Sequence, residues 1–307
     1  ANEGGGAIFF VSNDRSGSLV IRDSVLVSNP SDGFETMGYP GIFVLANGPP
    51  QVENSIIGDY PDVPDVCPEG VACDSVIFHD SGGRWHAWSA VASKHSEDVF
   101  YFGDPGDVAF SGDWDCDGID TPGLYRRSDG AVYLRNSNTQ GVADVRFFFG
   151  NPGDLPLAGD FDGDGCDSLS IYRPSESRIF IINELGSNDA GLGAAEFDFF
   201  FGNPGDKPFV GDFDGNGVDT VGLHRESTGL VYFRNTLTTG IAHSQFIYGD
   251  PGDVLVAGDW DGDGDDTVAV YRPSNGLLYV KLNNTQGYAD AAIPAGNGYR
   301  GLAPHGR

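Results

Sequence analysis

Short stretches of alternating apolar and polar residues, separated by Gly, Asn, Asp and Pro, run along almost the whole chain. Alternation with a period of two is typical of β-strands that bury one face, and clusters of Gly, Asn and Pro mark turns. Few stretches show the 3.6-residue period of an amphipathic helix. The pattern therefore predicts an all-β protein with many turns.

From about residue 75 onward the pattern repeats. Each copy contains an acidic segment Asp-x-Asp-x-Asp/Asn-Gly-x-Asp, and the segments begin at Asp113, Asp160, Asp212 and Asp259. The spacings are 47, 52 and 47 residues, with the extra five residues between Asn183 and Glu196. A turn containing Pro-Gly precedes each segment, and an Arg follows each first Asp by thirteen positions. A period of ~40–50 residues with four strands per unit is the sequence sign of a β-propeller blade.

The ends of the repeat indicate how many blades there are. In the second copy we expect strands near Leu155–Gly159, Leu169–Arg173, Arg178–Ile182 and Phe197–Phe201. A degenerate unit without an inner strand precedes the first copy, and a strand-like segment, Gly301–Pro304, follows the last. We therefore expect the C-terminal strand to complete the N-terminal blade. The prediction for residues 75–307 is a closed, five-bladed propeller without an open sheet edge.

Residues 1–62 have a different character. Short alternating segments at Gly5–Val11 and Ser18–Asn29 recur 33 to 34 residues later at Gly41–Leu45 and Gln51–Ile57. Such spacing resembles the coils of a right-handed parallel β-helix, although a small irregular β-cap fits the same pattern. Two coils are too few for a β-helix that is stable alone, because each coil buries its interior against neighbours on both sides. Residues 63–74 form a linker rich in Pro and Asp, with Cys67 and Cys73 placed to close a small disulfide loop.

The acidic segments carry the clearest chemistry. Oxygen ligands at alternate positions, with Gly at the sixth, suit a hard cation that needs 6–8 oxygens. The EF-hand begins with the same signature, but the twelfth position here is Leu124, Ile171, Leu223 or Val270 rather than Glu. No helical pattern flanks the segments. They are predicted to be calcium loops between β-strands, with acidic turns that bind no metal as the alternative.

The loops and their Gly-Asp-Phe/Trp-Asp entry resemble the calcium loops of FG-GAP and VCBS-type propellers, over about 230 residues. The resemblance implies about four Ca²⁺, held by side chains at loop positions one, three and five and by the backbone carbonyl at seven. In this chain these are Asp113, Asp115, Asp117 and Ile119; Asp160, Asp162, Asp164 and Cys166; Asp212, Asp214, Asn216 and Val218; and Asp259, Asp261, Asp263 and Asp265. The family often has Asp at position nine, where this chain has Thr121, Ser168, Thr220 and Thr267. We expect the aspartate at position eight to complete each shell instead: Asp120, Asp167, Asp219 and Asp266.

The second pair of cysteines lies in the first two loops. Cys116 is at the fourth position of one loop and Cys166 at the seventh position of the next. Equivalent loops of adjacent blades lie side by side on one face of a propeller, so a disulfide between them is expected. Two separate thiols in a reducing cell are the alternative, but calcium loops and an even number of cysteines favour an oxidising compartment outside the cell.

Charge and composition limit the classes of partner and of catalytic site that the sequence can support. The formal net charge is −28, which repels nucleic acid and anionic membranes. No apolar run is long enough to span a membrane. No signal-peptide pattern opens the sequence, so we expect the numbering to begin after a cleaved leader or within a longer protein. The six histidines show no metal-ligand spacing, and no Gly-x-Ser-x-Gly or phosphate loop is present.

We therefore expect a non-catalytic, secreted or surface-exposed bacterial propeller that acts in adhesion, recognition or assembly. Its partner would be a protein or a glycan at the cell surface, or a second copy of the chain. A carbohydrate-binding or polysaccharide-degrading protein and a subunit of an extracellular filament are the alternatives. The repeated Arg is expected to pair with a turn carboxylate rather than bind an anionic ligand. The repeated aromatic rows are expected to pack between blades rather than bind sugars. Trp85 and Trp88, beside His86, are the one irregular aromatic cluster where a sugar could bind.

Overall fold

The computed structural model describes residues 8–12, 14, 16–22, 25–27, 42–47, 50–53, 56–58, 67, 71, 73–80, 82–88, 97–104, 106–187, 189–295 and 299–305. These residues contain twenty-six β-strands and no helix, as the alternating pattern predicts. Consequently none of them belongs to a helix able to cross a membrane. The chain divides into two compact units, one containing residues 1–64 and the other most of residues 65–307.

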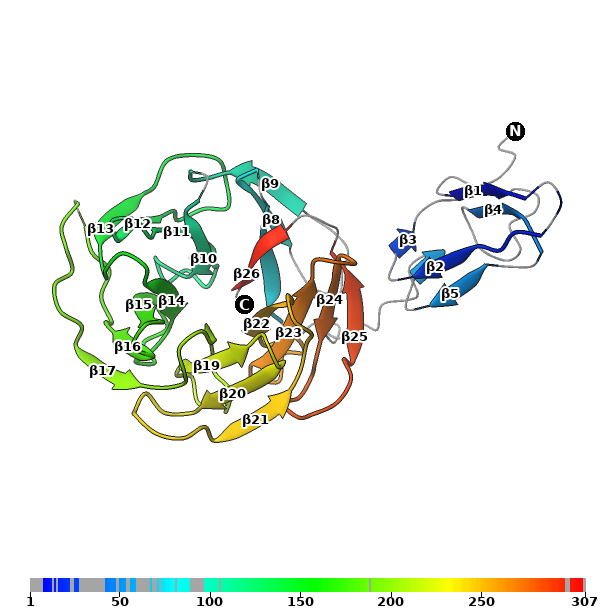
Figure 1. Cartoon of the computed structure of the whole chain (residues 1–307). Coiled ribbons are helices and arrows are strands. Elements are labelled where there is room, and N and C mark those ends of the chain that lie inside the picture. The colour runs from blue at the N-terminus through cyan, green and yellow to red at the C-terminus, as the bar shows by residue number, and fades with distance from the viewer. Residues whose placement is uncertain are drawn as a thin grey trace. The chain divides into compact units, whose positions relative to one another are not determined.

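The larger unit contains five sheets of four strands each, arranged as the blades of a propeller (Figure 1). Blade 1 consists of β10 (Val108–Gly112), β11 (Thr121–Arg126), β12 (Ala131–Leu134) and β13 (Val145–Phe148). Blade 2 consists of β14 (Leu155–Gly159), β15 (Ser168–Arg173), β16 (Arg178–Ile181) and β17 (Phe197–Phe200). Blade 3 consists of β18 (Lys207–Gly211), β19 (Thr220–Arg225), β20 (Leu230–Arg234) and β21 (Ser244–Ile247). Blade 4 consists of β22 (Val254–Gly258), β23 (Thr267–Arg272), β24 (Leu277–Val280) and β25 (Ala291–Pro294). The four strands predicted for blade 2 are confirmed.

Blade 5 joins the two ends of the propeller. Its strand order is β26 (Tyr299–His305), β7 (Ser75–Asp80), β8 (Arg84–Trp88) and β9 (Glu97–Tyr101). β26 and β7 are antiparallel, with Leu302 opposite Phe78 and His305 opposite Ser75. Figure 1 shows β26 and the C-terminus near the centre of the ring. The predicted closure by the C-terminal strand is therefore confirmed.

Apolar side chains hold neighbouring blades together. Phe147 and Phe149 of blade 1 form one buried cluster with Leu169 and Ile171 of blade 2. Equivalent clusters join blades 2 and 3 and blades 3 and 4. In each aromatic row the first and third side chains are buried, while the middle one faces outward, as the period of a strand requires. The aromatic rows thus pack between blades, as expected.

The repeated Arg pairs with the last Asp of the turn that precedes its loop. Nε and Nη2 of Arg173 donate to Oδ1 and Oδ2 of Asp154, at 2.9 and 2.8 Å. The same pair of hydrogen bonds forms in the other blades: Arg126 with Asp107, Arg225 with Asp206 and Arg272 with Asp253. Two parallel charge-assisted bonds fix the connection between blades, so the predicted structural role of this Arg is confirmed.

The five-residue insertion of blade 2 covers the edge of blade 1. Within this loop, Ala190 accepts a hydrogen bond from the backbone N–H of Phe148, and Leu192 donates one to the Phe148 carbonyl. Gly191 forms a parallel bridge with Phe148. The insertion therefore satisfies backbone groups of β13 that an outermost strand would leave unpaired.

The smaller unit contains three parallel strand pairs. They are β1 (Ile8–Val11) with β4 (Ile42–Leu45), β2 (Val20–Arg22) with β5 (Gln51–Glu53), and β3 (Val25–Val27) with β6 (Ile56–Gly58). Parallel pairing between segments about 30 residues apart is what successive coils of a β-helix require. The β-helix itself stays a prediction. Most of the 63–74 linker lies outside the described residues.

Candidate metal centre

Each acidic loop connects the innermost strand of its blade to the second strand. The four loops are 113–120 between β10 and β11, 160–167 between β14 and β15, 212–219 between β18 and β19, and 259–266 between β22 and β23. All four leave the same end of the blade meander, so they lie on one face of the propeller. The predicted placement of the loops between strands is confirmed.

The first Asp of each loop organises the backbone that follows it. Oδ1 of Asp160 accepts hydrogen bonds from the N–H groups of Gly163 and Asp164, at 2.7 and 3.1 Å, and Oδ2 accepts one from Gly165 at 2.8 Å. The other loops wrap around Asp113, Asp212 and Asp259 in the same way. The sixth position has a positive φ in every loop (87° at Gly165), which explains the glycine there.

This wrapping brings carboxylates together. In three loops, oxygens from positions one, three and five lie within 4.8 Å of one another: Asp113, Asp115 and Asp117; Asp160, Asp162 and Asp164; Asp259, Asp261 and Asp263. The remaining loop has Asn216 at position five, and its Oδ1 accepts a hydrogen bond from the N–H of Val218 at 2.8 Å. These three loops therefore bring together hard oxygen donors that could hold a metal ion.

The carboxylates in these groups repel one another. Burial, followed by the charges of Asp164 and Asp160, raises the pKa of Asp162. Burial and the charges of Asp263 and Asp259 raise the pKa of Asp261 in the same manner. A bound divalent cation would reverse this effect, because it stabilises the ionised carboxylates. The electrostatics of the loops thus fit a cation, and so does their donor set.

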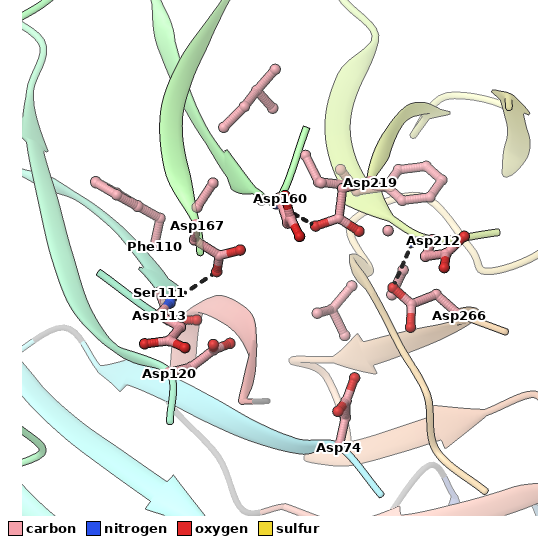
Figure 2. A pocket seen from close by; sticks show the side chains of 18 of the residues that line it. Asp74, Phe110, Ser111, Asp113, Asp120, Asp160, Asp167, Asp212, Asp219 and Asp266 are labelled. Atoms are coloured by element: carbon pink, nitrogen blue, oxygen red, sulfur yellow. Dashed lines mark hydrogen bonds between the residues drawn. The ribbon is translucent and has the colours of Figure 1, made fainter. Parts of the chain in front are cut away.

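Three of the four aspartates at position eight reach across to the preceding blade. Oδ2 of Asp167 accepts a hydrogen bond from the backbone N–H of Asp113 at 2.9 Å, and the N–H of Asp167 donates to the Asp113 carbonyl at 3.0 Å. Asp219 binds Asp160 and Asp266 binds Asp212 through the same two contacts. Figure 2 shows these side-chain bonds. In these three residues Oδ2 binds the loop of the preceding blade, a contact that we call the clasp, and completion of the shell by the aspartate at position eight stays a prediction.

A fourth contact of the same kind comes from a residue outside the loops. Oδ2 of Asp74 accepts a hydrogen bond from the N–H of Asp259 at 2.8 Å, and its own N–H donates to the Asp259 carbonyl at 2.8 Å. Sequence reasoning missed Asp74 because no acidic loop precedes it. An available signal was the Asp-Ser/Thr dipeptide at the start of the second strand of every blade: 74–75, 120–121, 167–168, 219–220 and 266–267. Asp74 therefore ties blade 4 to blade 5.

The glycine before each loop leaves room for the clasp. A Cβ on Gly159 would lie 2.7 Å from Oδ2 of Asp219, and one on Gly211 would lie 2.7 Å from Oδ2 of Asp266. Both distances are shorter than real Cβ contacts. At Gly159 and Gly211 the close approach of the neighbouring carboxylate thus explains the glycine, whereas at Gly112 and Gly258 the ring of Trp114 or Trp260 lies closer still.

These carboxylates line a cavity of about 500 Å³ at the inner ends of the blades (Figure 2). Burial, with the charges of Asp113, Asp160 and Asp74, raises the pKa of Asp167 to about 7. Burial and the charges of Asp266 and Asp167 raise the pKa of Asp219 well above its usual value, and the pKa of Asp266 is raised similarly. The cavity is therefore a region where negative charge accumulates.

Both predicted disulfides are present. Cys67 is bonded to Cys73 and Cys116 to Cys166, with Cα separations of 6.0 and 4.8 Å. Cys116 has a φ of 62°, in the left-handed region, where the other three loops have glycine. The position-four to position-seven contact between adjacent loops recurs without cysteines, since a Cβ on Gly163 would lie 3.2 Å from Cγ2 of Val218.

Comparisons with known proteins do not assign the chain to a family. No protein-family model matches the chain, and no curated protein sequence matches it. Among solved structures, the chain is similar to BBS1N from its crystal structure in complex with ARL6DN, with 11% identity and a TM-score of 0.37 over 64% of this chain and 58% of that one. It is also similar to a protein of unknown function from Bacteroides caccae, with 10% identity and a TM-score of 0.41 over 76% of this chain and 99% of that one. The likeness at these identities concerns the fold alone.

Proposed function

We propose that the protein is a calcium-stabilised propeller of the FG-GAP or VCBS type, with one Ca²⁺ in each of its four acidic loops. Side-chain oxygens at positions one, three and five would hold the ion, together with the backbone carbonyl at position seven. The observation that carries this proposal is the convergence of three carboxylates within 4.8 Å in three separate loops. The aspartate at position eight would complete the shell through its other oxygen, because Oδ2 of Asp167, Asp219 and Asp266 binds the neighbouring blade.

The role we propose is recognition or adhesion outside the cell, without catalysis. Two disulfides are compatible with an oxidising, extracellular setting. The parallel strand pairs of the N-terminal unit favour a second candidate, a filament subunit in which coils of neighbouring chains stack. Sedimentation of the purified protein separates the two: a monomer at all accessible concentrations supports recognition, and large concentration-dependent assemblies support the filament.

Thermal unfolding tests the metal assignment. Ordering four loops rich in carboxylates without cations costs electrostatic free energy, so bound calcium adds to the free energy of unfolding. We expect Tm to fall clearly in chelator and to recover with Ca²⁺ more than with Mg²⁺, which prefers a smaller octahedral site. Asp162→Asn should lessen the recovery, whereas Asp198→Asn, on outer strand β17, should not. Equal Tm values with and without chelator would contradict the assignment.

A further inference from the structure

The side chain at position seven of one acidic loop lies against position four of the loop before it. Between the first two loops this contact is a disulfide. Between the second and third loops, a Cβ on Gly163 would lie 3.2 Å from Cγ2 of Val218. Between the third and fourth loops, a Cβ on Gly215 would collide with Oδ1 of Asp265. The residue at position seven therefore extends its side chain out of its own loop and over the preceding one.

Asp265 lies near the carboxylates of two loops. Burial, followed by the negative charges of Asp263, Asp212 and Asp214, raises the pKa of Asp265. Asp263 belongs to the same loop, but Asp212 and Asp214 are positions one and three of the preceding loop. The position of Oδ1 over Gly215 agrees with this, because Gly215 directly follows Asp214. The carboxylate of Asp265 thus adds negative charge beside the third loop.

The third loop is the one that has a carboxylate fewer than the others. It carries Asn216 at position five, where the other loops have Asp117, Asp164 and Asp263. The amide oxygen of Asn216 is able to bind a cation, but it brings no charge. Since the affinity of a calcium site depends on the number of charged ligands, this loop by itself should bind Ca²⁺ more weakly than the other three.

The other two contacts between loops bring no charge. Position seven is Cys166 where the first loop is contacted and Val218 where the second loop is contacted. Both of those receiving loops have aspartate at positions one, three and five. The carboxylate of Asp265 therefore lies at the contact whose receiving loop lacks one of its own.

We infer that the side chain of Asp265 contributes to calcium binding in the neighbouring loop 212–219, where it compensates in part for the charge that Asn216 lacks. The inference rests on the proposed calcium function and assigns to one site a carboxylate from another blade. Attraction between a carboxylate and a divalent cation acts through space, so direct coordination is not required. The backbone carbonyl of Asp265 would serve the ion of its own loop, and the residue would thus connect two adjacent sites.

Calcium titration of the full chain against a competing chelator tests this role. Asp265→Asn should weaken one of the four sites about tenfold, because a nearby carboxylate attracts a divalent cation by about that factor in a water-like dielectric. In the metal-free protein the same change removes repulsion from Asp212 and Asp214, so Tm in chelator should not fall. A side chain that only supported the fold would instead lower Tm in chelator as well.

Three further variants identify the loop that is affected. Asp214→Ala removes a ligand of the third loop, and in this background Asp265→Asn should change none of the three remaining sites. Asn216→Asp combined with Asp265→Asn should restore the wild-type affinity, since the charge returns within the loop. Val218→Asp is the matched gain of function, because it places a carboxylate over the second loop and should tighten that site.

The outcomes separate this inference from the metal assignment on which it rests. Four unchanged sites in Asp265→Asn would overturn the inference alone. A loss that persists in the Asp214→Ala background would also overturn it, because the affected site would then be the loop of Asp265 itself. A wild-type protein that takes up no calcium in the titration would overturn the metal assignment and the inference together.

Discussion

Asp167 shows how the clasp between blades depends on protonation. Its folded pKa of about 7 lies above the value of about 3.9 for an unfolded chain. The folded state therefore binds the proton more tightly, and the resulting stability is present at low pH and lost as pH rises from about 4 to 7. The pKa values of Asp219 and Asp266 are also raised above those of an unfolded chain. Their ionisation adds to the cost of folding in the absence of a cation.

We therefore predict that the free energy of unfolding of the metal-free protein decreases between pH 5 and 7.5. Each carboxyl contributes a slope of up to about 1.4 kcal/mol per pH unit within its window. Asp167→Asn keeps an acceptor for the N–H of Asp113 but cannot ionise, so it should flatten the slope. Urea unfolding in chelator at a series of pH values measures this. An unchanged slope in Asp167→Asn, matching that of the exposed-site control Glu184→Gln, would count against the prediction.

The role of a loop position could be predicted from sequence where it depends only on residues of the same loop. Positions one, three, five and six follow from the fit between a hard cation and a tight turn, and the carboxylates at one, three and five do converge in three loops. Position eight differs because its partner lies 54 residues away for Asp167 and Asp113. That contact depends on how far one blade is rotated against the next, which no pattern within a single loop encodes. The partner of Asp74 is equally remote, at 185 residues, although the Asp-Ser/Thr dipeptide marks its position in the blade.

At the scale of elements, position four of one loop contacts position seven of the next loop in more than one pair of loops. In one pair both positions are cysteines. Gly163 and Val218 meet as Cys116 and Cys166 do, and Gly163 already has a φ of 77°. We predict that Gly163→Cys with Val218→Cys forms a second disulfide between loops. Closing about 55 residues would stabilise by roughly 4 kcal/mol in the chain-entropy view, less any strain.

Non-reducing peptide mapping and thermal unfolding with and without reductant measure this outcome. Gly163→Cys alone is the control, and it should be slightly less stable than wild type, because a side chain at this φ is strained. Free thiols at both positions in the folded double variant would contradict the assigned contact.

The strands themselves were largely predictable, because alternation and turn residues are local signals. The 183–196 insertion shows the limit of that approach. Its length and position were evident, but its pairing with β13 of the preceding blade was not, since the loop carries no strand pattern. The pairing follows from the exposed edge of β13, which only the assembled blade reveals.

At the scale of the whole molecule, closure depends on β26. Removing residues 297–307 would delete this strand and leave β7 paired on one side only, with β8. The inner edge of blade 5 and its contacts with both neighbouring blades would be lost together. We predict a large drop in Tm and a tendency to aggregate, because an unpaired edge pairs with other chains. A soluble truncated protein with the wild-type Tm, followed by circular dichroism, would show that the ring does not need its closing strand.

The most direct test of the account is the anomalous X-ray signal from crystals grown with Ca²⁺. We predict four peaks, one in each of the loops 113–120, 160–167, 212–219 and 259–266, each surrounded by oxygens from positions one, three and five. The weakest should lie in the loop with Asn216, which has one carboxylate fewer. Loops without any peak, or a signal confined to the cavity lined by Asp167, Asp219 and Asp266, would contradict the calcium-loop propeller.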